Sequence, residues 1–162
     1  MYNYDQKKID KLSKQLVSED KTIAVAESCT SGLIQNILSQ AKQATLFYQG
    51  GMTLYNLGQK AKHLNVNPIT SESCNSVSKE VAEKMAVEVA LAFNAELGVA
   101  ITGYAQPLPK LKVDSCFAYI AMAEGSKLLF SKKITGESSK TLLENQFIFM
   151  EKVINEIMKV LK

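Results

Sequence analysis

The stretch from residue 22 to residue 40 constrains the fold of this chain more than any other. Residues 23–26 form a short apolar run of strand length, which stops at the polar segment 27–32. Apolar side chains then recur at helical spacing over residues 33–38. A strand that turns through small hydroxyl residues into a helix places those hydroxyls at the carboxyl edge of a sheet, where open α/β sheets bind ligands. Ser28 is therefore predicted to lie where a nucleophile would be useful, beside helix N–H groups that can hold a developing oxyanion.

The rest of the sequence alternates helical and strand patterns. Helices are predicted over residues 4–18, 31–40, 59–64, 79–93 and 138–161, with a helical turn at 44–48. Strands are predicted over residues 22–26, 52–55, 97–102, 116–123 and 128–134, with Gly50-Gly51 bending the chain into the second of them. Helices lie between most strands and one hairpin comes late, so the pattern predicts a three-layer α/β/α sandwich with a mixed sheet. The length fits a single domain, residues 1–162.

The charge pattern bears on the class of partner. The formal net charge is +3, and all nineteen basic residues are lysines. Arginine is the usual residue for reading guanine or clamping phosphate, so we expect no direct nucleic-acid partner, whereas a small anionic ligand suits the mild positive charge. No apolar run approaches the roughly 18 residues of a membrane span, and the N-terminus lacks the apolar core of a signal peptide. The sequence therefore predicts a cytoplasmic protein without a membrane partner.

Cysteine and histidine usage argues against metal chemistry. The three cysteines Cys29, Cys74 and Cys116 are odd in number and far apart, and His63 is the only histidine. A zinc site with three or four Cys and His ligands cannot be built from these spacings, so we expect free thiols, no metal and no cofactor. A Ser-His-Asp triad is excluded as well, unless His63 is its member.

Two further segments are predicted to end near the same sheet edge, at residues 55–60 and 102–107. If the strands are neighbours, Tyr55, Lys60 and Thr102 converge with Ser28 on one pocket. A serine hydroxyl needs a base, and a lysine whose pKa is depressed by burial can serve, with a tyrosine to orient it or relay the proton. Cys29 is the stronger nucleophile in principle, but no histidine is placed to activate it.

Spacing alone leaves ordinary structural roles open for each of these residues. Ser28 could be a turn or capping serine, and Tyr55 a half-buried strand residue. Lys60 could be a surface lysine, and Thr102 a strand end. The spacing of Tyr55 and Lys60 also differs from the Tyr-x-x-x-Lys pair of short-chain dehydrogenases, and no Gly-x-Gly-x-x-Gly motif precedes them, which argues against a nucleotide-dependent oxidoreductase.

Four ordered motifs resemble the CinA C-terminal domain family. Residues 26–32, A-E-S-C-T-S-G, resemble the family signature A-E-S-C-T-G-G. Residues 47–55, F-Y-Q-G-G-M-T-L-Y, followed by Lys60 and the L-N-V of residues 64–66, resemble F-x-G-G-x-x-x-Y…K…L-x-V. The V-S-K-E-V-A of residues 77–82, with Met85-Ala86 behind it, and the A-I-T-G-Y-A-Q-P of residues 100–107 resemble V-S-x-x-V-A-x-x-M-A and A-I-T-G-I-A-G-P. The resemblance covers the chain from about residue 10 to residue 160.

The resemblance implies an α/β/α domain and an amidohydrolase that needs no metal. Family members hydrolyse the carboxamide of nicotinamide mononucleotide to nicotinate mononucleotide and ammonia, a step of pyridine-nucleotide recycling in NAD metabolism. Carried over by motif, Ser28 is the nucleophile, Lys60 the general base and Tyr55 its helper, and the backbone of residues 30–32 supplies oxyanion donors. The residues expected to bind the nucleotide substrate are Glu27, Thr30, Ser31, Gly32, Gly50, Gly51, Thr102, Gly103, Tyr104 and Ala105. The resemblance also implies a homo-oligomer, a dimer or larger.

The chain departs from the family in the half of the site that would hold a phosphate. Gln106, Leu108 and Pro109 replace glycines of a phosphate-side loop, and side chains keep a backbone from approaching a phosphate closely. Asp114 would repel a phosphate if it faced the site, and Ser31 replaces the first glycine of the signature pair. Two alternatives therefore stay open, a Ser/Lys hydrolase of a different amide and a binding module linked to competence or DNA damage.

Overall fold

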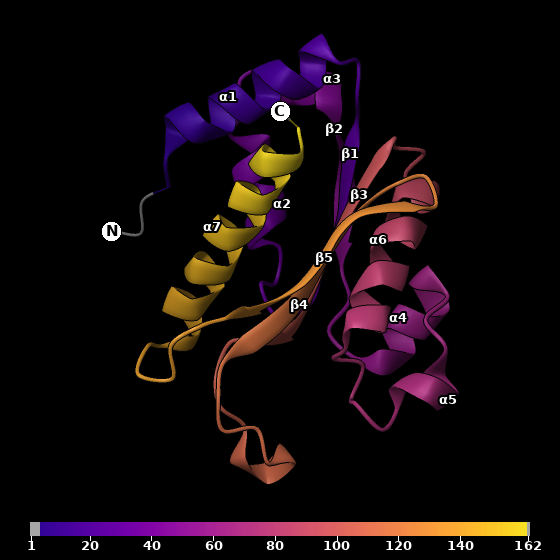
Figure 1. Ribbon diagram of the computed structural model, residues 1–162, viewed down its shortest axis with the longest axis vertical. Helices are drawn as coiled ribbons and strands as arrows, with labels where there is room; N and C mark the ends of the chain where they lie inside the picture. The colour runs from indigo at the N-terminus through magenta and orange to yellow at the C-terminus, as the bar shows by residue number, and fades with distance from the viewer. Residues whose placement is uncertain (1–3, 162) are drawn as a thin grey trace.

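Five strands form one mixed sheet in the computed structural model, which describes residues 4–161 (Figure 1). They are β1 (Ile23–Glu27), β2 (Tyr48–Thr53), β3 (Leu97–Tyr104), β4 (Phe117–Glu124) and β5 (Lys127–Thr135), in the order β2-β1-β3-β4-β5. β1 pairs in parallel with both β2 and β3, whereas β4 is antiparallel to β3 and to β5. The three parallel strands end at one edge, so the segments that follow them meet there.

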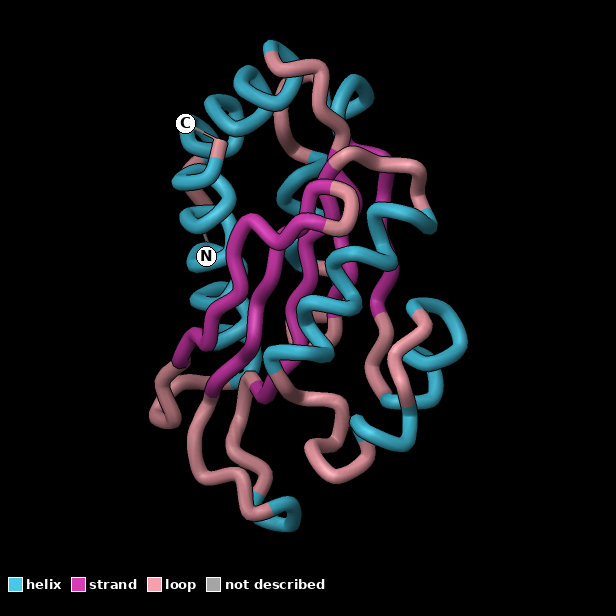
Figure 2. The backbone as a smooth tube through the Cα atoms, turned by 45° about the vertical axis from the view of Figure 1, so that its right-hand side comes forward, coloured by secondary structure: helices cyan, strands magenta, loops and turns pink. Residues whose placement is uncertain are grey.

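Helices cover both faces of the sheet, which confirms the predicted α/β/α sandwich. They are α1 (Gln6–Ser18), α2 (Leu33–Ser39), α3 (Ala44–Phe47), α4 (Leu57–Leu64), α5 (Pro68–Ser71), α6 (Lys79–Ala92) and α7 (Leu142–Val160), with a short 3₁₀ turn at Pro109–Leu111. α1, α2 and α7 lie on one side of the sheet, and α4, α5 and α6 lie on the other (Figure 1). The segment between β3 and β4, with its 3₁₀ turn, projects from the end of the sheet at which the parallel strands finish (Figure 2).

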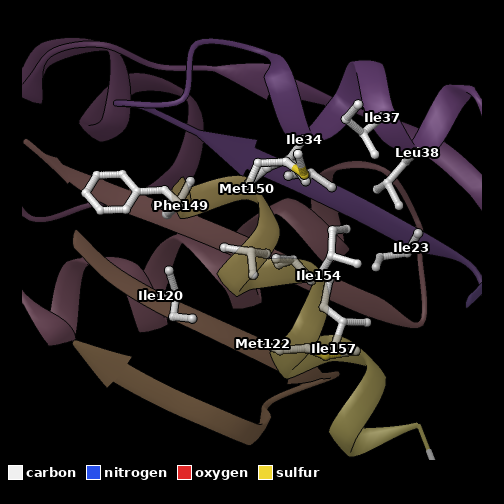
Figure 3. Packing of buried hydrophobic residues seen from close by; sticks show 14 of the residues in the cluster. Ile23, Ile34, Ile37, Leu38, Ile120, Met122, Phe149, Met150, Ile154 and Ile157 are labelled. Carbon is white, nitrogen blue, oxygen red and sulfur yellow. The ribbon is translucent and has the colours of Figure 1, made fainter. Parts of the chain in front are cut away.

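The two faces of the sheet are packed differently. On the α7 side, Ile23 and Ile120 of the sheet meet Ile154 and Ile157 of the helix, all of them buried (Figure 3). Full burial of such a side chain stabilises the fold by roughly 1.5–3 kcal/mol. On the α6 side the sheet presents small residues, and a Cβ on Gly98 would lie 1.9 Å from the carbonyl oxygen of Ala86. α6 therefore lies close against the strands that carry the site.

The structure corrects several element boundaries. β2 begins at Tyr48 and runs through Gly50 and Gly51 rather than starting after them. A Cβ on Gly51 would lie 2.3 Å from the carbonyl oxygen of Val25, so this glycine lets two strands pair closely instead of bending the chain. α7 begins at Leu142, later than predicted, because Thr141 and Glu144 form a capping box in front of it.

Candidate active site

The turn after β1 is fixed by a buried carboxylate. Glu27 is fully buried, and its oxygens accept hydrogen bonds from the Thr30 hydroxyl at 2.5 Å and from the N–H groups of Gly32, Ile34 and Gln35 at 3.1, 3.2 and 2.7 Å. The N–H groups at the start of a helix otherwise lack partners, so Glu27 caps α2 from within the core. Its carboxylate is thus engaged in holding the turn that carries Ser28.

The same contacts change the assignment of the oxyanion donors. The N–H of Gly32 donates to Glu27, and the N–H of Ser31 donates to the carbonyl oxygen of Ser28 at 3.0 Å. Neither group is therefore free to hold an oxyanion, so of the expected donors in residues 30–32 only the N–H of Thr30 stays a candidate. The next N–H groups along the chain after Ser28 are those of Cys29 and Thr30.

Lys60 reaches Ser28 from the second of the converging segments. α4 begins after Asn56, whose side chain accepts from the N–H of Gln59 at 3.0 Å, and its first turn carries Lys60 inward. Only 2% of Lys60 is exposed, and its Nζ lies 3.2 Å from Ser28 Oγ. Burial lowers the pKa of Lys60 to about 8, so roughly a tenth of the amine is uncharged at pH 7 and about half at pH 8.

A second hydroxyl, that of Ser76, also touches the Lys60 amine, at 3.0 Å. Ser76 lies in the segment between α5 and α6, where its N–H donates to the carbonyl oxygen of Ser71. Its own carbonyl oxygen accepts a hydrogen bond from the buried hydroxyl of Thr102 on β3 at 2.8 Å. Sequence reasoning missed Ser76, because nothing in its spacing separates it from the other serines of residues 71–78.

Ser28, Lys60 and Ser76 line a cavity of about 150 Å³. Its walls are formed by Ser28, Cys29, Tyr55, Asn56, Lys60, Asn75, Ser76, Val77, Gly103, Tyr104, Ala105, Gln106, Leu108 and Leu142. Tyr55 is 64% exposed there, and the Lys60 amine donates its hydrogen bonds to Ser28 and Ser76 rather than to Tyr55. On the far wall the Tyr104 hydroxyl accepts from Asn75 Nδ2 at 3.3 Å.

Three of the residues expected to bind the substrate line this cavity, namely Gly103, Tyr104 and Ala105. The others do not, namely Glu27, Thr30, Ser31, Gly32, Gly50, Gly51 and Thr102. Their contacts show what they do instead. Gly51 lets β2 approach β1, and a Cβ on Gly50 would press on the Phe93 ring at 3.1 Å. Thr102 anchors Ser76, so it acts on the cavity from behind.

The segment that departs from the family pattern is closed upon itself. The N–H groups of Leu108 and Val113 donate to each other's carbonyl oxygens, and those of Leu111 and Lys112 donate to Leu108 and Pro109. These N–H groups are therefore not available to a phosphate. Asp114 is exposed and is not among the residues that line the cavity, so it does not confront a ligand bound beside Ser28.

Cys29 lines the cavity next to Ser28 but is poorly suited to attack. Burial raises the pKa of its thiol to about 12, so the nucleophilic thiolate is scarce at neutral pH. All three cysteines are free thiols. Between residues 4 and 161, no three His, Cys, Asp or Glu side chains gather in a way that could hold a metal ion.

None of the helices in the described part of the chain has both the length and the apolar character that crossing a bilayer requires. The sequence-based expectation of a cytoplasmic protein stays a prediction beyond that point.

Comparison with known proteins places this geometry in a family. The CinA C-terminal domain profile matches residues 5–161. A CinA-like protein of Amoebophilus asiaticus is 37% identical over 108 residues, which make up 66% of this chain and 26% of that protein, and a CinA-like protein of Mycobacterium marinum is 37% identical over 107 residues. The chain thus spans about a quarter of the length of such relatives.

Solved structures agree with the fold. A competence or damage-inducible protein from Enterobacter asburiae superposes with a TM-score of 0.88 at 21% identity, over 99% of this chain and 100% of that one. A competence-damaged protein (CinA) superfamily protein from Escherichia coli gives a TM-score of 0.79 at 23% identity, over 98% and 94% of the two chains. The profile match and the shared fold together show that this chain belongs to the CinA C-terminal domain family.

Proposed function

We propose that the chain is an amidohydrolase in which Ser28 is the nucleophile and Lys60 the general base. The observation that carries the proposal is the 3.2 Å contact between Ser28 Oγ and Lys60 Nζ in the wall of a cavity. The two residues come from segments 32 positions apart, and burial lowers the pKa of the amine to about 8. A base whose pKa lies near the working pH is what general-base catalysis requires.

The chemistry follows from this contact. The uncharged Lys60 amine takes the hydroxyl proton as Ser28 Oγ bonds to the carboxamide carbon. The resulting ammonium returns that proton to the amide nitrogen as the carbon–nitrogen bond breaks, and ammonia leaves. Lys60 then takes a proton from water, which attacks the ester carbon, and the proton returns to Ser28 Oγ as the carboxylic acid is released. Tyr55, on the exposed wall, is placed to contact the substrate.

The oxyanion of the tetrahedral intermediate needs donors beside Ser28. The N–H groups of Ser31 and Gly32 are occupied, so we assign this role to the backbone of Cys29 and Thr30, directly after the nucleophile. Loss of one such donor in other hydrolases costs roughly a hundredfold to a thousandfold in rate. Glu27 supports the arrangement by holding the turn in place.

The family resemblance favours nicotinamide mononucleotide as the substrate. The closed segment 107–113 favours a second candidate, a carboxamide without a phosphate, because four of its backbone N–H groups are engaged internally. A binding module linked to competence, as the names of the relatives suggest, is the least supported reading, since such a module has no need of a lysine buried against a serine.

The test is ammonia release from nicotinamide mononucleotide and from a panel of phosphate-free carboxamides. We expect turnover by the wild-type chain and a loss of at least about a thousandfold in Ser28→Ala and Lys60→Met. Ser73→Ala, an exposed serine outside the cavity, serves as the matched control and should keep full activity. Full activity of Ser28→Ala, or no turnover of any carboxamide, would overturn the proposal.

A further inference from the structure

The Lys60 amine is shared between two hydroxyls, and the proposed mechanism uses one of them. Its Nζ lies 3.2 Å from Ser28 Oγ and 3.0 Å from Ser76 Oγ, and both serines line the cavity. We propose that Ser76 is a positioning residue: its hydroxyl accepts one N–H of the uncharged amine and thereby turns the nitrogen lone pair toward Ser28. This inference rests on the proposed Ser28–Lys60 chemistry.

The need for such a partner follows from the shape of a lysine amine. An uncharged amine has two N–H groups and one lone pair, and it rotates about the last bond of a flexible chain. With Ser28 as its one neighbour, the amine could equally donate an N–H to that hydroxyl, which would leave the lone pair turned away from the proton that it must take. An acceptor on the other side of the nitrogen selects the productive rotamer, and Ser76 Oγ is that acceptor.

The fold holds Ser76 firmly enough for this role. Asn75 and Ser76 have φ angles of +49° and +56°, in the left-handed region that residues other than glycine rarely adopt. The Ser76 N–H donates to the carbonyl oxygen of Ser71, and the Thr102 hydroxyl donates to the Ser76 carbonyl oxygen. Strained backbone of this kind gathers at functional sites and persists where surrounding contacts determine it.

The hydroxyl of Ser76 also affects the protonation of Lys60. An acceptor beside the amine favours the ammonium form, so removal of the hydroxyl should lower the pKa of Lys60 below about 8. The other titratable groups in the cavity wall are Cys29, Tyr55 and Tyr104, and Glu27 lies behind the turn with both oxygens hydrogen-bonded. Because burial raises the pKa of Cys29 to about 12, its thiol stays protonated across the range in which Lys60 titrates.

Two substitutions separate the hydroxyl from the backbone. Ser76→Gly and Ser76→Ala both remove the hydroxyl, but glycine relieves the positive φ whereas alanine keeps it. If the hydroxyl positions Lys60, both variants lose reactivity equally although their stabilities differ. If Ser76 matters through backbone shape alone, Ser76→Gly keeps the reactivity of the wild type.

The readout is the rate at which a fluorophosphonate labels Ser28, followed by intact mass and peptide mapping between pH 6 and pH 10. In this reaction Ser28 Oγ bonds to phosphorus, fluoride leaves, and Lys60 takes the hydroxyl proton. We expect the rate at the high-pH plateau to fall by about tenfold to a hundredfold in both Ser76 variants. The rising limb of the pH profile should move to lower pH, and Ser73→Ala should match the wild type in both respects.

The outcomes distinguish the two proposals. A wild-type rate in Ser76→Gly, an unmoved pH limb, or a label that maps to Ser76 overturns the positioning role even where carboxamide hydrolysis is intact. A wild-type chain that takes the label at Ser28 but hydrolyses no carboxamide overturns the proposed function, while the Ser76 comparison still decides the inference. A wild-type chain that takes no label at Ser28 overturns both.

Discussion

Lys60 places an ionisable amine where water can hardly reach it. In the part of the chain that the structure describes, its nitrogen forms no ion pair, and its partners are two neutral hydroxyls. Burial penalises the ammonium form, which is why the pKa falls from 10.5 to about 8. The same penalty destabilises the folded chain at neutral pH.

Replacement of Lys60 by methionine should expose this penalty. The folded-state pKa lies below the unfolded value, so between about pH 8 and pH 10.5 the unfolded chain binds more protons and rising pH stabilises the wild type. Below pH 8 both states are protonated and the full penalty applies. We expect Lys60→Met to raise the free energy of unfolding at pH 7 by about 1–2 kcal/mol, after allowance for the hydrogen bonds lost to Ser28 and Ser76.

Urea denaturation of both proteins at pH 7 and pH 10.5, followed by circular dichroism, measures the difference. The gain at pH 7 should shrink toward zero, or reverse, at the higher pH. A variant that is less stable than the wild type at pH 7, or a difference that is the same at both values, would contradict a desolvated charge at this position.

Ser31 shows a smaller strain at the neighbouring turn. Its φ is +50°, and it is exposed, where the family signature has glycine. A left-handed conformation costs a residue with a Cβ about 1–2 kcal/mol, partly offset by the greater freedom of glycine in the unfolded chain. Ser31→Gly should therefore raise the unfolding free energy by about 0.5–1 kcal/mol, measured by urea denaturation. Ser139→Gly, at an exposed turn without positive φ, should lower it, and equal effects of the two changes would refute the strain.

At the scale of an element, α2 depends on a cap that lies inside the core. Glu27 accepts four hydrogen bonds from the first turn of the helix and the residues before it. Glu27→Ala would leave three N–H groups and a buried hydroxyl without partners, at about 1–3 kcal/mol each where water cannot enter. We expect its unfolding free energy to fall by at least about 3 kcal/mol.

Glu27→Gln is the matched comparison, because one of its two terminal groups still accepts. Its loss in chemical denaturation should be clearly smaller than that of Glu27→Ala. The fluorophosphonate reaction of Ser28 should slow in both, since the capped turn carries Ser28. If Glu27→Ala unfolds like the wild type, the buried cap does not hold this turn.

Local pattern was sufficient to predict the elements whose burial is periodic. The apolar stripe of α7 and the short apolar run of β1 both lie where their spacing indicated. Both contribute buried residues to the same hydrophobic core. β2 was placed too late because Gly50 and Gly51 are ordinary turn signals. What keeps them glycine is contact with Val25 and Phe93, which are distant in sequence. No local rule contains that information.

Some residues of the candidate site could likewise be predicted from local sequence, and others could not. Ser28 and Lys60 were predicted because a strand-to-helix turn and a motif point to them, and the structure brings the two side chains into contact. Ser76 was not predicted, since its position depends on a left-handed backbone and on the hydroxyl of Thr102 across the sheet edge. The sequence does not show that the N–H of Gly32 is engaged by Glu27 and that of Ser31 by the Ser28 carbonyl, so it could not remove these two groups from the expected oxyanion donors.

At the scale of the whole molecule, sheet topology assembles the site. β1 lies between β2 and β3, all parallel, so the segments that carry Ser28, Lys60 and Gly103 leave the sheet at one edge. α7 closes the same cavity from the other layer through Leu142. Ser28 and Lys60 are thus positioned by the turn after β1 and by α4, whereas the segment that projects after β3 (Figure 1) is held mainly by its own backbone.

The closed segment after β3 predicts how much the phosphate of a nucleotide substrate contributes to kcat/KM. Pro107 and Pro109 have no N–H, and the N–H groups of Leu108 and Val113 are paired with each other, so the segment cannot cradle a phosphate as a glycine loop does. Its two lysines, Lys110 and Lys112, are exposed, and salt screens exposed charges. We therefore expect kcat/KM for nicotinamide riboside to lie within about tenfold of that for nicotinamide mononucleotide, a difference of no more than about 1.4 kcal/mol.

Initial rates of ammonia release from the two compounds at matched ionic strength measure this ratio. Lys110→Gln combined with Lys112→Gln should lower the rate with the nucleotide only slightly, and raised salt should have a similarly small effect on the wild type. A preference for the nucleotide of a hundredfold or more would mean that the phosphate is gripped by groups elsewhere in the cavity wall. In that case another part of the cavity would bind the phosphate in place of the closed segment.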